Sequence, residues 1–215
     1  AARMGLSPEA LQAINPQLIY CNLSGYGEDG PYRDKKAYDL LIQSEAGLLS
    51  ITGTPDEPSK AGISIADIAA GMYTYTNIMA ALLLRQKTGK GSVIDVSMLE
   101  ALGEWMGYAM YYSTDSASPP PRTGATHATI YPYGPFKAGD GKTIMLGLQN
   151  EREWELFCEK VLDQPALAKD PRFEKNFKRN ENRIELQQII LDRFASLTSE
   201  QVIAKLDAAQ IANAS

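Results

Sequence analysis

Residues 65–84 form a long apolar segment that contains one charged side chain, Asp67, and the next charge along the chain is Arg85. A segment of this kind becomes either a membrane span or a long helix of a protein core. It is interrupted by Gly71, Tyr73, Thr74, Thr76 and Asn77, which favours the buried core helix. Asp67 then has two interpretations: a first-turn charge that suits the helix dipole, or a reactive carboxylate with small neighbours that leave room for a substrate.

Composition limits the partners. With 215 residues, of which 44% are hydrophobic, the chain can bury a substantial core in one or two units. Its net charge of −5 is spread along the sequence, which argues against nucleic acid or a membrane surface as a partner. Cys21 and Cys158 form no CxxC motif, as is typical of a reduced, cytoplasmic protein, or a mitochondrial one if the source is eukaryotic. Buried structural cysteines are favoured over a catalytic thiol paired with His127.

Helical and strand-like patterns alternate before residue 113, which predicts an α/β architecture. The helices are expected at 8–14, 38–48, 65–88 and 97–112, and the strands at 18–23, as a buried run, and 93–96. Two strands are too few for a parallel sheet covered on both faces. We therefore expect further strands from outside this chain, and we expect the chain alone to expose the apolar faces of 65–84 and 98–112.

A Ser- and Pro-rich stretch at 113–121 indicates a linker. The predicted organisation is a large domain at 1–115, a linker at 116–130 and a small α+β domain at 131–215. In the small domain, a hairpin should join 133–137 to 143–148 around Gly139, Asp140 and Gly141. Helices should follow at 151–162, 182–194 and 201–209, and the last begins with a capping box of Thr198 and Gln201.

Several common catalytic motifs are missing. The turn at 88–91 is no phosphate loop, because Leu84 stands where the first glycine should be and Gly91 follows Lys90. One histidine and two distant cysteines give no metal-ligand set, and no Gly-x-Ser-x-Gly elbow occurs. Carboxylate chemistry is what remains, since an ionised Asp can attack a thioester at neutral pH.

The order of several short motifs resembles a known family. They are Tyr38-Asp39-Leu40-Leu41, Thr52-Gly53, Ala66-Asp67, Lys87-Thr88-Gly89-Lys90-Gly91 and Val93-Ile94-Asp95-Val96. This succession is similar to that of the class III CoA-transferases, which include formyl-CoA and carnitine CoA-transferases and the related α-methylacyl-CoA racemases. The resemblance covers nearly the whole chain and indicates an internal fragment of a longer protein. Its most specific parts are the Ala66-Asp67 segment and the 87–91 turn at this spacing.

The resemblance implies both a fold and a reaction. The fold is a Rossmann-like large domain, incomplete in this chain, with a smaller α+β domain, in an interlocked homodimer. The reaction moves CoA from an acyl-CoA such as succinyl-CoA to a carboxylic, in particular a dicarboxylic, acid. Asp67 matches the nucleophile position and would carry CoA as an aspartyl-CoA thioester, without ATP or metal.

Further residues are implied in binding. Arg3, Met4, Lys36 and Tyr38 align with positions around CoA, and Arg and Lys suit its phosphates. The alternatives are a solvated loop for Lys36 and core packing for Tyr38. His127 follows the large domain and is either a substrate contact or an ordinary loop histidine.

Two departures narrow the choice of activity. The glycine-rich stretch of formyl-CoA transferases is absent and 131–135 takes its place, so oxalate is not expected as acceptor. The racemase branch uses a histidine where this chain has Tyr38, which favours a transferase over a racemase or isomerase. A non-catalytic acyl-CoA-binding fragment is the third alternative.

Overall fold

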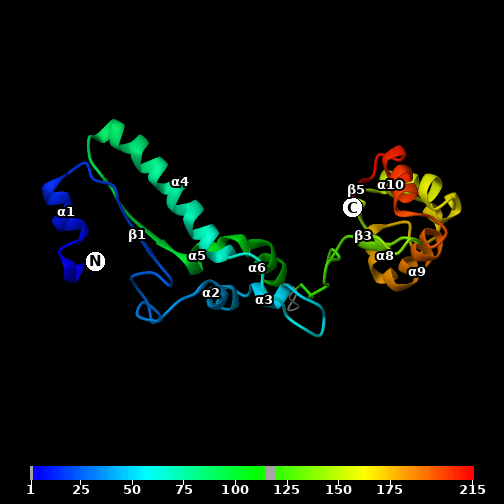
Figure 1. Ribbon diagram of the computed structural model, residues 1–215, viewed down its shortest axis with the longest axis horizontal. Helices are drawn as coiled ribbons and strands as arrows, with labels where there is room; N and C mark the ends of the chain where they lie inside the picture. The colour runs from blue at the N-terminus through cyan, green and yellow to red at the C-terminus, as the bar shows by residue number, and fades with distance from the viewer. Residues whose placement is uncertain (1, 115–119) are drawn as a thin grey trace. The chain divides into compact units, whose positions relative to one another are not determined.

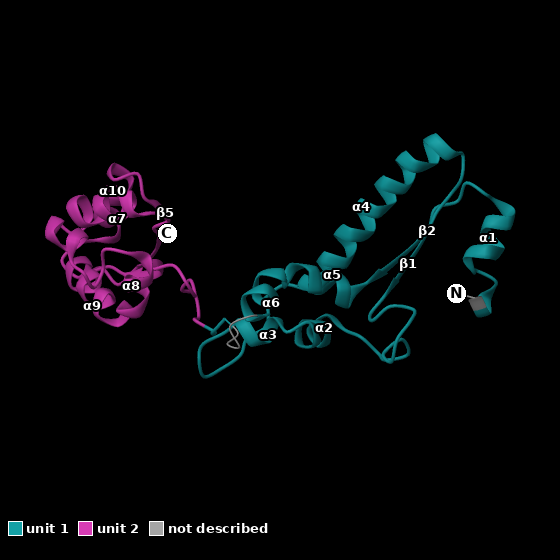
Figure 2. Cartoon of the chain, turned by 180° about the vertical axis from the view of Figure 1, so that it is seen from behind, with its two compact units in different colours: residues 1–122 teal, residues 123–215 magenta. Residues whose placement is uncertain are grey.

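The computed structural model describes residues 2–114 and 120–215 (Figure 1). The chain divides into two compact units, 1–122 and 123–215 (Figure 2). Of the expected linker, residues 116–119 lie outside the described residues. Arg122 is tied to the first unit, because its side chain donates to the carbonyl oxygens of Thr54 and Pro55 at 2.9 Å each.

The first unit is a mixed α/β structure, as the sequence predicts. Its two strands pair in parallel, with Tyr20 opposite Val93 and Ser24 opposite Ser97. The long helix α4 lies between them in sequence and begins and ends close to its predicted limits. In chain order the elements are η1 (Ala2–Met4), α1 (Pro8–Ile14), β1 (Tyr20–Ser24), α2 (Asp39–Glu45), α3 (Leu48–Ile51), α4 (Ile65–Thr88), β2 (Val93–Ser97), α5 (Met98–Trp105) and α6 (Gly107–Thr114).

The core of the first unit is built mostly from small side chains. Helix α4 buries Ala66, Ala69, Ala70 and Ala81, and three of them pack with Ile42, Val96, Met98, Ala101 and Leu102. The larger apolar residues of α4 lie on the open side, where Ile68, Met72, Tyr75, Met79 and Leu83 are 44% to 66% exposed. The expected buried core helix is therefore wrong for this chain, while the expected exposure of its apolar face is confirmed.

Three further expectations need correction. The helix expected at 38–48 is two helices, because Gly47 adopts a positive φ of 83° between α2 and α3, a conformation that ends a helix. The helix at 97–112 divides at Met106, between Gly103 and Gly107, which are poor helix formers. The strand β1 is half-buried with Leu23 exposed, so the buried run expected at 18–23 is not buried.

The second unit is α+β. The predicted hairpin is present, and β3 and β4 are joined by a third antiparallel strand, β5. The predicted capping box of Thr198 and Gln201 is also present. The sequence patterns do not predict strand β5 and helix α8, because both are short, with three and six residues. The elements are β3 (Tyr133–Lys137), β4 (Thr143–Gly147), α7 (Glu151–Leu156), the π-helix η2 (Phe157–Val161), η3 (Pro165–Lys169), α8 (Asn176–Glu181), α9 (Arg183–Phe194), α10 (Ser199–Ala208) and β5 (Ala212–Ala214).

Large side chains fill the core of this second unit. Trp154, Phe157, Phe173 and Phe194 are almost completely buried in one cluster. Arg179 is buried beside them, where it pairs with Glu151 at 2.8 Å and donates to the carbonyl oxygens of Tyr131 and Phe173. These three hydrogen bonds offset part of the cost of burying the cation. None of the described helices is both long and apolar enough to cross a membrane.

Candidate active site

Asp67 lies in the first turn of α4 and is exposed. Within the described part of the chain, no hydrogen bond or ion pair engages its carboxylate. The residues around it are small: Ala66, Ala69 and Ala70 are buried, and the space beside Gly71 is open. The structure therefore leaves this carboxylate accessible to a substrate, as its small neighbours predict.

The start of α4 is held by side chains of α2. One carboxylate oxygen of Asp39 accepts the backbone N–H of Ala66 at 2.8 Å, and the other accepts the side-chain amide of Gln43 at 2.6 Å. The oxygen of the Gln43 amide accepts the N–H of Ala61 at 2.9 Å. Sequence analysis missed this network, although the four-residue spacing of Asp39 and Gln43 on a predicted helix was a usable signal.

Tyr38 is the residue at the N-cap of α2 and is 69% exposed, so it does not pack into a core in this chain. The residue that follows it, Asp39, hydrogen-bonds to Ala66, which precedes Asp67. Tyr38 and Asp67 are thus the chain neighbours of the two residues that this hydrogen bond joins.

Lys35 and Lys36 have different surroundings. Lys35 pairs with Glu45, and its Nζ lies 4.1 Å from the centre of the Tyr32 ring. The hydrogen bond to Glu45 raises the pKa of Lys35 above its ordinary value. Lys36 is exposed, and across residues 2–114 and 120–215 it makes no hydrogen bond or ion pair. Of the two lysines, Lys36 is the one available to a ligand.

Arg3 and Met4 line a cavity of about 770 Å³ in the first unit. Strand residues such as Tyr20 and Val93 line it as well, whereas Asp67 does not. Among the described residues that line it, Arg3 is the one cation, and Glu9, Glu28 and Asp95 supply three carboxylates. The structure therefore does not bring Arg3 and Met4 into one cavity with Asp67.

His127 belongs to the second unit and is held in a defined orientation. Its Nδ1 accepts the backbone N–H groups of Thr129 and Ile130, both at 3.1 Å. Its ring stacks on Tyr133 with 5.2 Å between the ring centres, and Arg183 donates to its carbonyl oxygen at 3.2 Å. Because Nδ1 is the acceptor in both bonds, Nε2 is the ring nitrogen that carries a proton in this arrangement. His127 can therefore donate a hydrogen bond through Nε2.

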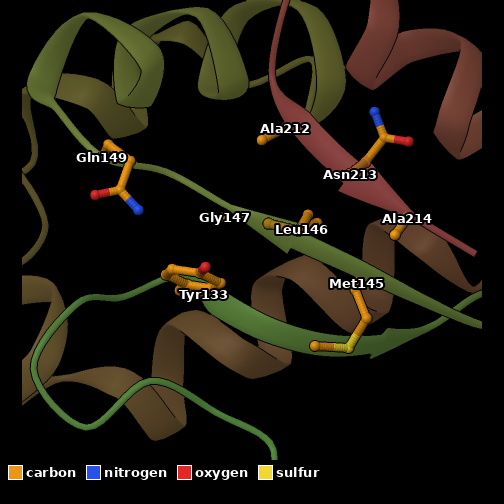
Figure 3. Close-up of a pocket in the computed structure, with 8 residues that line it drawn as sticks. All are labelled: Tyr133, Met145, Leu146, Gly147, Gln149, Ala212, Asn213 and Ala214. Carbon is orange, nitrogen blue, oxygen red and sulfur yellow. The ribbon is translucent and has the colours of Figure 1, made fainter. Parts of the chain in front are cut away.

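The Tyr133 ring rests on the sheet beside Gly147, next to a cavity of about 290 Å³ (Figure 3). A Cβ at Gly147 would lie 3.0 Å from that ring, so a larger residue there would require the ring to shift by a few tenths of an ångström. The amide side chains of Gln149 and Asn213 supply polar groups around the cavity. The His127 ring is therefore stacked on an aromatic ring that itself packs on the β-sheet.

The surroundings of the two cysteines do not favour thiol chemistry. Cys158 is completely buried, and that burial raises its pKa to about 12, so it stays a thiol at neutral pH and is no partner for His127. Cys21 lies half-buried in β1. Among the described residues, no group of three or more His, Cys, Asp or Glu side chains could hold a metal ion.

Comparisons with known proteins show which family the chain resembles. The family model of CoA-transferase family III matches residues 1–215. A succinate–glutarate CoA-transferase of Agrobacterium fabrum is 37% identical over 88% of this chain and 47% of its own. An acetyl-CoA:oxalate CoA-transferase of Acetobacter aceti is 36% identical over 84% of this chain and 46% of its own. A solved CAIB/BAIF family protein from Brucella suis superposes with a TM-score of 0.82 at 33% identity, over 100% of this chain and 56% of its own.

The chain spans about half the length of the curated relatives it matches. Because the family model covers the chain from one end to the other, the resemblance stated from the motifs is confirmed. The chain belongs to CoA-transferase family III.

Proposed function

We propose that the whole protein is a CoA-transferase that uses Asp67 as its nucleophile. The observation that supports this most strongly is the exposed, unpaired Asp67 carboxylate among small residues at the start of α4. The relatives add support, since they are named as transferases that use CoA thioesters and dicarboxylic acids.

The proposed reaction proceeds in four balanced steps. The Asp67 carboxylate attacks the thioester carbonyl of the donor, which releases the CoA thiolate and leaves a mixed anhydride. The thiolate attacks the Asp67 carbonyl, which releases the donor acid and leaves an aspartyl-CoA thioester. The acceptor carboxylate then attacks the carbonyl of this thioester, which releases the thiolate again and leaves a second mixed anhydride, between Asp67 and the acceptor. Attack of the thiolate on the acceptor carbonyl gives the new acyl-CoA and frees Asp67.

The binding residues proposed from the sequence divide by unit. Lys36 offers a free cation for the CoA phosphates, and the exposed Tyr38 offers a ring and a hydroxyl near the start of α4. Arg3 and Met4 are further CoA contacts, in a cavity that Asp67 does not line. The Nε2–H of His127 is suited to donate to a carboxylate of the acid. We further propose a Rossmann-like large domain, an interlocked homodimer and a cytoplasmic location for the whole protein.

The acceptor is proposed to be a dicarboxylic acid, with succinyl-CoA as donor. The name of the Agrobacterium fabrum relative pairs succinate with glutarate, which fits this choice. The Acetobacter aceti relative, at nearly the same identity, is named for oxalate. Transfer of CoA to oxalate therefore has to be measured. A panel of dicarboxylic acids that includes oxalate, assayed with succinyl-CoA, would identify the acceptor.

The role of Asp67 can be tested with Asp67→Asn in the whole protein. We expect CoA transfer to be lost, because an amide cannot form the anhydride. Glu200→Gln is the matched control: Glu200 is also an exposed acid in the first turn of a helix, α10, and its loss should leave turnover unchanged. Either change removes a charge worth roughly 0.3–1 kcal/mol at a helix start, so stability effects should be similar.

Trapping provides the second readout. After incubation of the wild type with succinyl-CoA, hydroxylamine should modify the peptide that contains Asp67. Retained turnover in Asp67→Asn would exclude the proposed mechanism. Deuterium uptake at the α-carbon of a 2-methylacyl-CoA in heavy water, at a rate comparable to turnover, would favour the racemase instead.

A further inference from the structure

We propose that Asp39 and Gln43 are positioning residues that keep the Asp67 carboxylate free and correctly placed. This inference rests on the nucleophilic role of Asp67 proposed above. It assigns a task to two polar side chains of α2 that do not touch the reacting atoms themselves.

The first turn of any helix has backbone N–H groups without a partner inside the helix. In α4 the N-cap residue, Ser64, makes no side-chain cap. A carboxylate within the first turn is attracted to such unpaired amides and to the helix dipole, and Asp67 occupies this place. Without another acceptor, these backbone amides would compete with a substrate for the Asp67 carboxylate.

Asp39 removes this competition at one amide of the first turn, from outside the helix. Its Oδ1 accepts the Ala66 N–H at 2.8 Å, directly beside Asp67. The amide is therefore satisfied by a residue of α2 rather than by Asp67, whose carboxylate has no bonded partner among the described residues. The same bond fixes the start of α4 relative to α2.

Gln43 fixes Asp39 in turn. It is completely buried, with its Nε2 donating to Oδ2 of Asp39 at 2.6 Å and its Oε1 accepting the Ala61 N–H at 2.9 Å. A buried amide that lost these bonds would be costly, so the pair has one favoured arrangement. The loop before α4 and its first turn are thus held by one connected set of hydrogen bonds.

The second unit contains a matched arrangement without a nucleophile. Oδ2 of Asp140 accepts the backbone N–H of Ser199 at 2.9 Å and the Ser199 hydroxyl at 2.7 Å, at the first residue of α10. Asp140 therefore supports a helix start from outside, as Asp39 does. It provides a control for the purely structural effect of removing such a carboxylate.

The test uses Asp39→Asn in the whole protein, alone and together with Gln43→Glu. The single change keeps an oxygen for Ala66 but turns an amide N–H₂ toward the Gln43 amide, so two donors face each other. Adding Gln43→Glu supplies an acceptor for that amide, keeps one for the Ala61 N–H, and keeps the charge of the pair.

We expect Asp39→Asn to lower kcat about 10- to 100-fold, with the KM for acyl-CoA changed less than about threefold, because placement of the nucleophile is lost while binding is not. The double variant should recover kcat to within about threefold of the wild type. Asp140→Asn should lower the melting temperature and leave kcat within about twofold of the wild type. Hydrogen–deuterium exchange in the first turn of α4 should rise in Asp39→Asn and return in the double variant.

Several outcomes would overturn the inference. One is an unchanged kcat and exchange in Asp39→Asn when the wild type transfers CoA, which leaves the proposed function standing. Another is an equal loss of kcat in Asp39→Asn and Asp140→Asn, which indicates a merely structural effect. A wild type that transfers CoA to no acid would refute the proposed function and the catalytic part of this inference, while the exchange data would still report on the hydrogen bonds.

Discussion

At the scale of single residues, surroundings separate side chains that look equivalent in the sequence. Lys35 is engaged by Glu45 and by the Tyr32 ring, whereas its neighbour Lys36 is unpaired in the described structure. At His127, two backbone amides bond to Nδ1 and so leave Nε2–H as the donor of the ring. Each difference comes from contacts with residues that the sequence pattern did not connect to these positions.

These contacts predict that Lys36 contributes to the binding of acyl-CoA and His127 to the binding of the acid. Lys36→Ala should raise the KM for acyl-CoA about 10- to 100-fold at nearly constant kcat, as loss of a charge-assisted phosphate contact requires. His127→Ala should raise the KM for the acid and leave that for acyl-CoA unchanged. Steady-state kinetics with both substrates varied would test this, and Lys35→Ala serves as the control for a lysine already paired.

If Lys35→Ala and Lys36→Ala raised the KM for acyl-CoA equally, the assignment of the phosphate contact to Lys36 would be wrong. A His127→Ala enzyme with an unchanged KM for every acid tested would return His127 to the role of a loop residue.

At the scale of helices, both units use a carboxylate from elsewhere in the chain to complete a helix start. Asp39 serves α4 and Asp140 serves α10. The bonds to Ser199, first of all its backbone N–H, hold the pKa of Asp140 below its ordinary value. The contribution of Asp140 to stability therefore depends on pH in a definite direction.

Because the pKa of Asp140 is lowered by folding, its contribution is fully present above the unfolded value of about 3.9 and is lost as the pH falls through the lower folded value. We expect Asp140→Asn to melt at a lower temperature than the wild type near neutral pH. The difference in melting temperature should shrink in strongly acidic solution, where the wild-type carboxyl is protonated and therefore uncharged, like the amide of the variant. Melting curves across this pH range provide the measurement, and a constant difference would contradict the assigned bonds.

At the scale of the whole chain, the two units differ in how they are stabilised. Unit 123–215 has one contiguous core of large side chains that includes Trp154 and Phe157. In unit 1–122, the buried residues of α4 are all alanines, while larger apolar side chains of that helix are exposed. Burying each such side chain would contribute roughly 1.5–3 kcal/mol, so unit 1–122 lacks much of the stabilisation that its composition could provide.

This contrast predicts different behaviour for the two units. Residues 123–215 expressed alone should melt cooperatively as a monomer. Residues 1–122, and the whole chain of 1–215, should aggregate or bind the dye ANS through the exposed face of α4. Calorimetry, sedimentation and dye binding would test both statements. A cooperatively melting, monodisperse monomer of 1–122 would show that the open face of α4 needs no partner.

The sequence by itself determined the type and order of most elements. The capping box at Thr198 and the hairpin around Asp140 are where local chemistry predicts them, because each depends on residues close in the chain. The family was also within reach of sequence, since the motif around Asp67 and the 87–91 turn are short and fixed in spacing. The long apolar segment predicted a helix correctly and its burial wrongly.

Only the tertiary structure decided which side of α4 is buried and what surrounds Asp67. Burial depends on the elements packed against a helix, and here α5 and β2 meet its alanines while the larger residues face outward. The bond from Asp39 to Ala66 joins residues 27 positions apart, and no local pattern encodes that contact. Hydrogen bonds between distant segments are fixed by the packing of whole elements, which is why they appear only once the chain is folded.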